Sequence, residues 1–259
     1  MQEVRYVAIG DSFSEGVGDE DASGNPRGWA DLVAQGWARS LGQPIQYANL
    51  AIRGKLAWPI VQEQLEPALA LRPTHLSFNG GGNDMLRPRT TIEHIVDAFE
   101  VVARRCREEG VTLILLSGAN PARQLPLGSL IQRRGDALSA ATQKRLLGAT
   151  ESEHPVLTSL NWEDRELTNP DYWSPDRLHM GPRGHHRVAA RTLAAVGAHA
   201  PDEWWSLPIA PARGPRGAAY YREHVGPWIG RRLTRRSSGD GRQAKYGSWI
   251  EIDPAVAAF

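Results

Sequence analysis

The sequence is nearly free of cysteine, and this scarcity limits what the chain can be. Cys106 is the only thiol among 259 residues. A lone cysteine cannot form an intrachain disulfide, and a cluster of thiolates around a metal ion is excluded for the same reason. We therefore expect no disulfide framework, and no residue pattern calls for a metal or another cofactor.

Long apolar runs and a surplus of one charge are missing as well. No apolar stretch approaches the roughly 20 residues that a membrane-spanning helix needs, so we expect no membrane span. The 30 Lys and Arg residues nearly balance the 29 Asp and Glu residues, and such a balance gives no attraction to nucleic acid. The first residues lead into an apolar segment without a basic-then-apolar signal region, so we expect a cytoplasmic protein.

Among the residues that are present, the stretch Val4–Gly18 organises the rest, with the sequence VRYVAIGDSFSEGVG. Its first part, Val4–Ile9, is rich in β-branched residues and predicts a buried strand. Gly10 breaks this strand and leaves Asp11 and Ser12 on the following turn. A small polar residue just past a buried strand is well placed to act as a nucleophile, because the loops at the end of a sheet carry its chemistry.

Predicted strands and helices alternate along residues 1–200. The expected strands span Val4–Ile9, Ile45–Leu50, Thr74–Phe78, Val111–Leu116 and Pro155–Leu160. The expected helices span Trp29–Leu41, about Pro59–Leu71, Thr91–Glu109, about Asp136–Leu147 and Gly181–Val196. Such alternation predicts an α/β fold, which we expect to be a flavodoxin-like, three-layer α/β/α domain. Its five-stranded parallel sheet would have the order 2-1-3-4-5, with the first strand beside the switch point where such sheets bind ligands.

Acyl transfer by a serine requires a base, a group that orients the base, and donors for the developing oxyanion. Asp176 stands three residues before His179, and within one turn its carboxylate can hold the imidazole N–H. His179 is therefore the candidate base and Asp176 the orienting group. Gly54 offers a backbone N–H that a substrate oxygen can approach, and Asn83 offers its side-chain amide. Each of these segments follows a predicted strand, so one edge of the sheet can bring them to Ser12.

These blocks resemble, in order and spacing, those of the SGNH hydrolases, also called the GDSL family of esterases and lipases. The matching blocks are Gly10-Asp11-Ser12, Gly54, Gly81-Gly82-Asn83-Asp84 and Asp176 to His179, within about residues 4–195. The resemblance implies a serine esterase that hydrolyses a carboxylic ester through an acyl-enzyme on Ser12, with His179 as base and Asp176 as its orienter. It also implies an oxyanion hole made of the Ser12 N–H, the Gly54 N–H and the Asn83 side chain.

Other functions fit parts of the same pattern. A nucleotide-binding module would use glycines after the first strand, but its G-x-G-x-x-G fingerprint needs glycine where Ser12 stands, and no Walker lysine follows. A family scaffold without catalysis is opposed by the intact block residues. An acyltransferase would use the same acyl-enzyme and pass the acyl group to an alcohol or thiol, so this alternative stays open.

The expected partner is a small-molecule ester, whose acyl and leaving groups the residues do not define. His185 and His186 are the only rivals of His179 as the base. Both lack a carboxylate three residues before them, and we therefore rank them far behind.

Residues 201–259 form an extension rich in aromatic residues, proline and arginine. The aromatic residues include Trp204, Trp205, Tyr220, Tyr221, Trp228, Tyr246 and Trp249. Disordered tails hold few aromatic side chains, because burying them stabilises ordered structure. We therefore expect an ordered arm packed across the domain, or across a partner subunit in a homo-oligomer. Its expected parts are a helix at Ala218–Leu233 interrupted by Pro227, a mobile linker at Arg235–Arg242 and a strand at Tyr246–Asp253.

Overall fold

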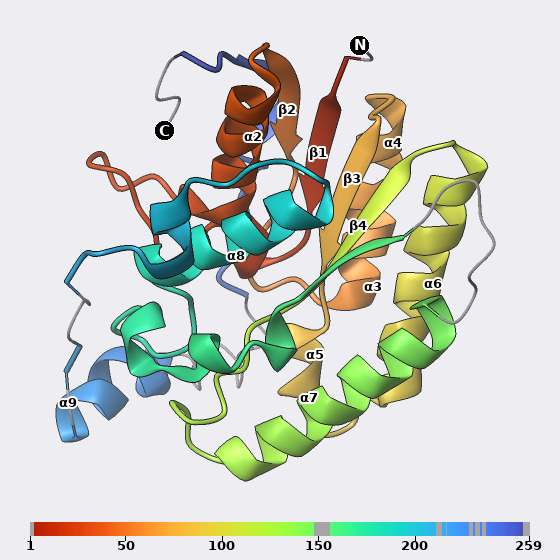
Figure 1. Cartoon of the computed structure of the whole chain (residues 1–259). Coiled ribbons are helices and arrows are strands. Elements are labelled where there is room, and N and C mark those ends of the chain that lie inside the picture. The colour runs from red at the N-terminus through yellow and green to blue at the C-terminus, as the bar shows by residue number, and fades with distance from the viewer. Residues whose placement is uncertain are drawn as a thin grey trace.

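A six-stranded sheet forms the centre of the described chain (Figure 1). The computed structural model describes residues 3–147, 156–210, 214–215, 217–227, 230, 234 and 237–255. The strands are β1 (Arg5–Ile9), β2 (Ile45–Asn49), β3 (His75–Asn79), β4 (Thr112–Ser117), β5 (Leu157–Leu160) and β6 (Tyr246–Ile252). They follow the order β5-β4-β3-β1-β2-β6. The predicted order 2-1-3-4-5 is confirmed, but the expected count of five strands was too low, because β6 extends the sheet beyond β2.

The first strand lies inside the sheet, with parallel neighbours β2 and β3 on its two sides. Its side chains alternate between two apolar cores. Tyr6 and Ala8 belong to the core on one face, whereas Val7 and Ile9 belong to the core on the other. A strand covered on both faces needs apolar residues throughout, which explains its composition. The chain leaves β1 between the two layers, and Gly10 to Ser12 follow there.

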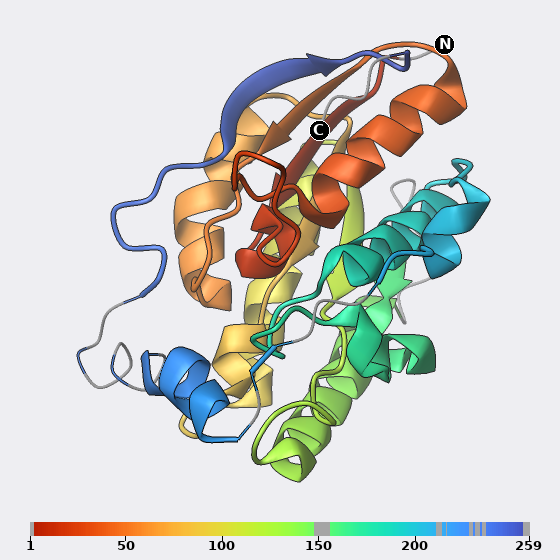
Figure 2. The same cartoon turned by 90° about the vertical axis from the view of Figure 1, so that its left-hand side faces the viewer.

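Helices cover both faces of this sheet (Figures 1 and 2). On one face, α2 (Gly28–Leu41) packs against α8 (Pro182–Ala195). The other face carries α3 (Ala57–Ile60), a π-helical turn (Val61–Leu65), α4 (Glu66–Ala70) and α6 (Ile92–Glu108), with α7 (Gly128–Thr142) and a second π-helical turn (Gln143–Leu147) beside α6. The connections hold α1 (Ser12–Glu15), α5 (Gly82–Met85) and the 3₁₀ turns Asn161–Glu163, Arg165–Thr168 and Pro170–Tyr172. The predicted three-layer fold is thus confirmed.

One helix begins well before its predicted start. Instead of starting near Asp136, α7 starts at Gly128. Its early turns carry polar side chains that interrupt the apolar period. Arg134, for example, donates to the carbonyl oxygens of Met85 (2.8 Å) and Thr90 (2.6 Å). The other predicted elements of residues 1–200 agree within a few residues, and Pro155 lies outside the described residues.

The extension after residue 200 runs over the same domain in its described parts (Figure 2). It contains a 3₁₀ turn (Asp202–Ser206), the short helix α9 (Ala218–Tyr220), a π-helical turn (Tyr221–Val225) and β6. The predicted strand is confirmed as β6, which pairs antiparallel with β2. The predicted helix at Ala218–Leu233 is confirmed in its first part, because residues 218–227 are helical throughout, and Trp228 lies outside the described residues. The division at residue 200 and the homo-oligomer remain predictions.

Two further points concern the extension and the helices. Of the predicted mobile linker, residues 237–242 are described, and they form hydrogen-bonded turns against the domain. Residues 235–236 lie outside the described residues. Among the helices of the described residues, none is both long and apolar enough to cross a bilayer.

Candidate active site

Ser12 opens α1 directly after β1, and several hydrogen bonds fix this turn. The Asp11 carboxylate caps the helix by accepting from the Phe13 N–H (3.0 Å). The Gln64 side chain accepts from the Gly10 N–H (2.8 Å) and donates to the Gly10 carbonyl (3.0 Å). The backbone on both sides of Ser12 is therefore held. Sequence reasoning missed Gln64, because a lone glutamine gives no signal of a backbone partner 54 residues away.

The structure brings Ser12, His179 and Asp176 together in a row. The Ser12 Oγ lies 3.1 Å from His179 Nε2, and His179 Nδ1 lies 2.6 Å from Asp176 Oδ2. An ionised carboxylate only accepts hydrogen bonds, so the proton of a neutral imidazole is held on Nδ1. Nε2 is then unprotonated and faces the serine hydroxyl. This arrangement can remove the proton from Ser12 when its oxygen attacks a substrate.

Asp176 lies in surroundings that favour its charged form. Burial alone would raise the pKa of Asp176, but hydrogen bonds from the His179 imidazole, the His179 N–H and the Ser174 hydroxyl outweigh it. The net effect holds the pKa of this carboxyl well below its usual range. Asp176 therefore stays ionised wherever the site could operate, which keeps the imidazole oriented. The spacing predicted the contact with His179, whereas Ser174 was not anticipated.

The turn that carries Asp176 and His179 is held from the extension. Arg177 takes a φ of +61°, in the left-handed region that non-glycine residues rarely adopt. Its guanidinium lies 4.1 Å from the centre of the Tyr220 ring, and the Tyr220 hydroxyl donates to the Asp176 carbonyl (3.1 Å). Tyr220 is buried, so an aromatic residue of the extension supports a strained turn of the site.

The Gly54 segment lies between α1 and Asn83. The Arg53 N–H donates to the Glu15 carboxylate at the end of α1 (2.6 Å), and the Lys55 carbonyl accepts from the Asn83 amide (3.0 Å). Gly54 itself has a φ of +78°, which favours glycine. Within the described residues, neither the Gly54 N–H nor the Ser12 N–H donates to another protein group. Ser12 lines the cavity of the site, whereas Gly54 is not among its lining residues.

Asn83 is engaged on both of its amide hydrogens. Besides the bond to the Lys55 carbonyl, its Nδ2 donates to Asp11 Oδ2 (3.1 Å). Burial raises the pKa of Asp11 to about 6, although the hydrogen bond from the Phe13 N–H and the charge of His179 both lower it. Asp11 therefore joins the nucleophile turn to the Asn83 loop. Asp84, in turn, accepts from the Ala57 N–H (2.9 Å), so both carboxylates brace loops of the site.

The rival histidines are held by other groups, and the neighbouring serine is buried. His185 is fully buried, and it accepts from the Trp29 N–H (3.0 Å) and lies 3.2 Å from the Val17 carbonyl. Burial lowers the pKa of His185 to about 4. The His186 ring contacts the Pro182 carbonyl (2.8 Å) within its own helix. Ser14 is 0% exposed, so Ser12 is the serine of this turn that a substrate can reach.

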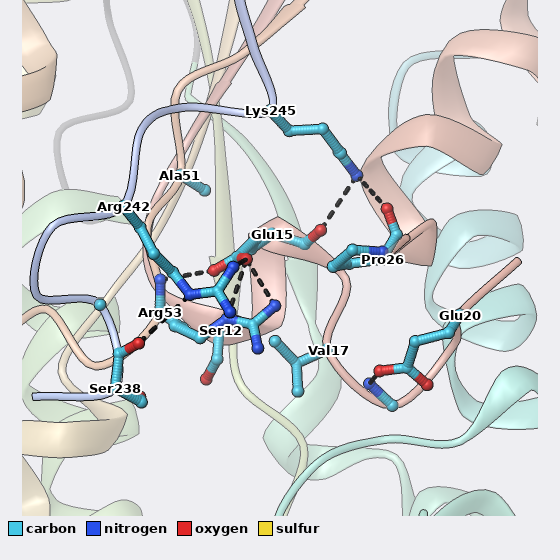
Figure 3. Close-up of polar contacts among 12 residues, drawn as sticks. Ser12, Glu15, Val17, Glu20, Pro26, Ala51, Arg53, Ser238, Arg242 and Lys245 are labelled. Carbon is cyan, nitrogen blue, oxygen red and sulfur yellow. Dashed lines mark hydrogen bonds and ion pairs between the residues drawn. The ribbon is translucent and has the colours of Figure 1, made fainter. Parts of the chain in front are cut away.

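Glu15 is a further residue of the site that sequence reasoning did not identify. Its carboxylate is buried and accepts from the Arg53 backbone and from two guanidinium nitrogens of Arg53 at 2.8 and 2.6 Å. Figure 3 shows Arg53 and Arg242 converging on this carboxylate, with Lys245 reaching the Glu15 carbonyl. The Arg53 side chain is thus occupied within the protein.

A largely apolar cavity of about 140 Å³ opens beside Ser12. Ser12, Asn83 and His179 line it together with apolar side chains of the sheet and of α6 and α7, among them Phe99, Leu116, Ile131, Leu138 and Trp162. In the described residues, no group of three or more His, Cys, Asp or Glu side chains has the geometry to hold a metal ion. The site therefore offers a nucleophile, a base and an apolar space in contact with both.

Comparison with known proteins identifies the family of the chain and solved structures of similar fold. The GDSL-like lipase/acylhydrolase family matches residues 8–187. The fold is similar to the lipase Lip_vut3 from a goat rumen metagenome (TM-score 0.60, 18% identity, 76% of this chain and 98% of the other). It is also similar to LAE5, an alpha/beta hydrolase enzyme from the metagenome of Lake Arreo, with a TM-score of 0.58 and 21% identity over 75% of this chain and 95% of the other. A variant of Axe2, an acetyl xylan esterase from Geobacillus stearothermophilus, gives a TM-score of 0.58 and 17% identity over 77% of this chain and 98% of the other. No curated protein matches the chain.

Proposed function

The chain belongs to the GDSL-like lipase/acylhydrolase family, and we propose that it is a serine esterase that cleaves a carboxylic ester through an acyl-enzyme on Ser12. The observation that carries the proposal is the row from Ser12 Oγ to His179 Nε2 (3.1 Å) and from His179 Nδ1 to Asp176 Oδ2 (2.6 Å). Membership of the family supports hydrolase chemistry. The geometry supports the assignment of each role to a particular residue.

In the first half of the reaction, Ser12 Oγ attacks the ester carbonyl carbon while its proton moves to His179 Nε2. The carbonyl oxygen becomes an oxyanion. His179 then gives the proton to the leaving alkoxide, and the C–O bond to the alcohol breaks. In the second half, water attacks the acyl-enzyme while His179 Nε2 takes a proton from this water, and His179 then gives that proton to Ser12 Oγ as the bond to the acyl group breaks and the acid leaves. Asp176 stays ionised and stabilises the imidazolium that forms in each half.

The oxyanion would be held by the N–H groups of Ser12 and Gly54 and by the side chain of Asn83. Donors that are fixed before the reaction stabilise a developing charge most effectively. The two backbone groups meet this condition, because neither is engaged within the described residues. Asn83 contributes only by exchanging its bond to the Lys55 carbonyl or to Asp11 for the substrate oxygen. Keeping the Asp11 bond would preserve the orientation of the amide, so the Lys55 bond is the one that we expect to open.

The cavity supports an ester with a short to medium apolar acyl group. An engineered protein cavity of about 150 Å³ with an apolar lining holds benzene, a molecule of six carbons. A cavity of about 140 Å³ therefore has space for an acyl chain of roughly that size. The apolar walls gain free energy by removing methylene groups from water, at about 0.8 kcal/mol for each.

A panel of p-nitrophenyl esters of rising acyl length tests this function. We expect turnover to be highest from butyrate to octanoate and to fall towards palmitate, with free acid as the product. Ser12→Ala should abolish turnover of every ester. A protein that hydrolyses none of them is better described as a non-catalytic scaffold. Activity only when an alcohol or thiol acceptor is added would identify the acyltransferase.

A further inference from the structure

The turn at residues 237–239 presses on the peptide that carries the Gly54 N–H. A Cβ placed on Gly239 would lie 2.2 Å from the Arg53 carbonyl oxygen, so the backbone of residue 239 is in direct contact with that carbonyl. The Arg53 carbonyl and the Gly54 N–H belong to one planar peptide unit. A contact that fixes the carbonyl therefore also fixes the direction of the N–H.

Ser237, in the same turn as Gly239, packs directly against Gly54. A Cβ on Gly54 would lie 2.2 Å from the Ser237 hydroxyl oxygen, which shows how closely the two segments pack. The turn itself is fixed, because the Ser237 N–H donates to Asp240 (2.8 Å) and the Gly239 N–H donates to the Ser237 hydroxyl (3.2 Å). The segment next to Gly54 is thus an ordered turn with its own hydrogen bonds.

Lys245, farther along the same segment, holds the end of the nucleophile helix. Its ammonium nitrogen lies 3.0 Å from the Glu15 carbonyl, at the last residue of α1, and 2.8 Å from the buried carboxylate of Asp31 in α2. It also lies 2.9 Å from the Pro26 carbonyl oxygen (Figure 3) and 2.9 Å from the Arg27 carbonyl oxygen. Four oxygens therefore share the three N–H groups of one largely buried ammonium, which joins α1 to the start of α2.

Glu15 connects these two contacts. Its carbonyl accepts from Lys245, and its carboxylate accepts from the Arg53 N–H (2.6 Å). Arg53 is thus held at its N–H by the Glu15 carboxylate and at its carbonyl by Gly239. Arg242 adds a guanidinium 4.0 Å from the same carboxylate. The segment 237–245 thus contacts the Arg53–Gly54 peptide directly, and it contacts α1, which carries the Ser12 N–H, at its last residue.

From these contacts we propose that residues 237–245, here called the C-terminal clamp, position the oxyanion hole, an inference that rests on the proposed esterase function. Gly239 and Lys245 are positioning residues, which act through the Gly54 peptide and through α1. The family match ends at residue 187, well before the clamp. Solved structures of similar fold cover 75–77% of this chain but 95–98% of their own. The clamp therefore lies outside the part of this chain that matches the family.

Gly239→Ala tests the clamp, with Gly247→Ala as the matched control. A Cβ at position 247 meets only the Ala244 Cβ, at 3.9 Å, which is an ordinary contact, whereas at position 239 it meets the Arg53 carbonyl. We expect Gly239→Ala to lower kcat at least about tenfold and to leave KM nearly unchanged. This loss is smaller than the 10²- to 10³-fold loss of kcat that follows complete removal of an oxyanion donor, because the Gly54 N–H is displaced and not removed. Gly247→Ala should behave like the wild type.

A boronic acid that forms a tetrahedral adduct with Ser12 gives a second measurement. Its Kd should weaken in Gly239→Ala by about the same factor as kcat, because the adduct resembles the transition state. Should Gly239→Ala fold poorly, Ser237→Ala removes a smaller contact of the same turn and should lower kcat about threefold. The clamp is refuted if both variants keep the kcat and boronate Kd of Gly247→Ala while Ser12→Ala is inactive. An active Ser12→Ala would instead overturn the proposed function itself.

Discussion

Ser12 and His179 stand 167 residues apart in the chain, yet Ser12 Oγ and His179 Nε2 are separated by 3.1 Å. The contact arises because the chain leaves β1 inside the sheet, while the Asp176–His179 turn reaches the same edge from the far side of β5. Among the described residues, no other side chain bonds to Ser12 Oγ or His179 Nε2, and His179 Nδ1 is held by Asp176. The relationship defines how the site can work and how it can be tested.

Replacement of His179 and Asp176 should show that they act together. His179→Ala should lower kcat by about 10⁴ to 10⁶, and Asp176→Ala should cost roughly ten- to a hundredfold less, as in other serine hydrolases. The double variant should be little worse than His179→Ala alone, because the orienting group has no role without the base. Losses that multiply in the double variant would mean that the two residues work separately. Steady-state kinetics on one nitrophenyl ester decides between these results.

Asn83→Ala should affect the transition state more than the bound substrate. Removal of one oxyanion donor costs about 10² to 10³ in turnover, so kcat should fall by that factor while KM stays within about twofold. Asn83→Asp keeps the size of the side chain but removes the donor, and it serves as the matched variant. A change confined to KM would assign Asn83 to substrate positioning.

Asp11 should make stability depend on pH in a defined direction. Burial raises its pKa from 3.8 to about 6 in the folded protein, so the folded state binds this proton more tightly than the unfolded state. The resulting stabilisation is complete below about pH 4 and is lost as the pH rises through about 6. Asp11→Asn cannot ionise and does not lose this stabilisation. The free energy of unfolding of the variant minus that of the wild type should therefore rise by roughly 3 kcal/mol from pH 4 to pH 7. Denaturant unfolding at both pH values measures this difference, and parallel pH profiles would contradict it.

Lys245 and Asp31 should be strongly coupled in stability. Lys245→Met leaves the Asp31 carboxylate buried without its cation, and breaking a buried ion pair in this way costs about 3 to 5 kcal/mol. The double variant Lys245→Met/Asp31→Asn removes both charges and should recover part of that loss. A double-mutant cycle from urea unfolding gives the coupling energy. Purely additive losses would show that the contact contributes little.

Much of this architecture follows from local patterns in the sequence. The alternating apolar residues of β1 and the continuous apolar run of β4 predict strands that are covered on both faces, and such strands require helices on each side. The site residues could also be predicted, because each stands just after a predicted strand or in a spacing with its own chemical meaning, as Asp176 and His179 do. The start of α7 was missed because the polar run Gln132–Arg134 and then Gly135 interrupt the apolar pattern after Ile131.

Contacts that depend on distant partners could not be predicted. Lys245 lies 214 residues from Asp31, and a single lysine before a short strand looks like any surface charge. Gln64 and Glu15 give no local signal either, since their partners are backbone groups of other loops. The antiparallel pairing of β6 with β2 depends on which edge of the sheet is free, and the sequence of β6 does not encode that.

Labelling of Ser12 is the most direct test of the account. A fluorophosphonate probe reacts with a serine that a base has activated, and mass spectrometry identifies the modified peptide. We expect the wild type to carry one label, on Ser12, and Ser12→Ala to carry none, with His179→Ala labelled far more slowly. Labelling that persists in Ser12→Ala, or that maps to another residue such as Ser14, would contradict the assignment of Ser12 as the nucleophile.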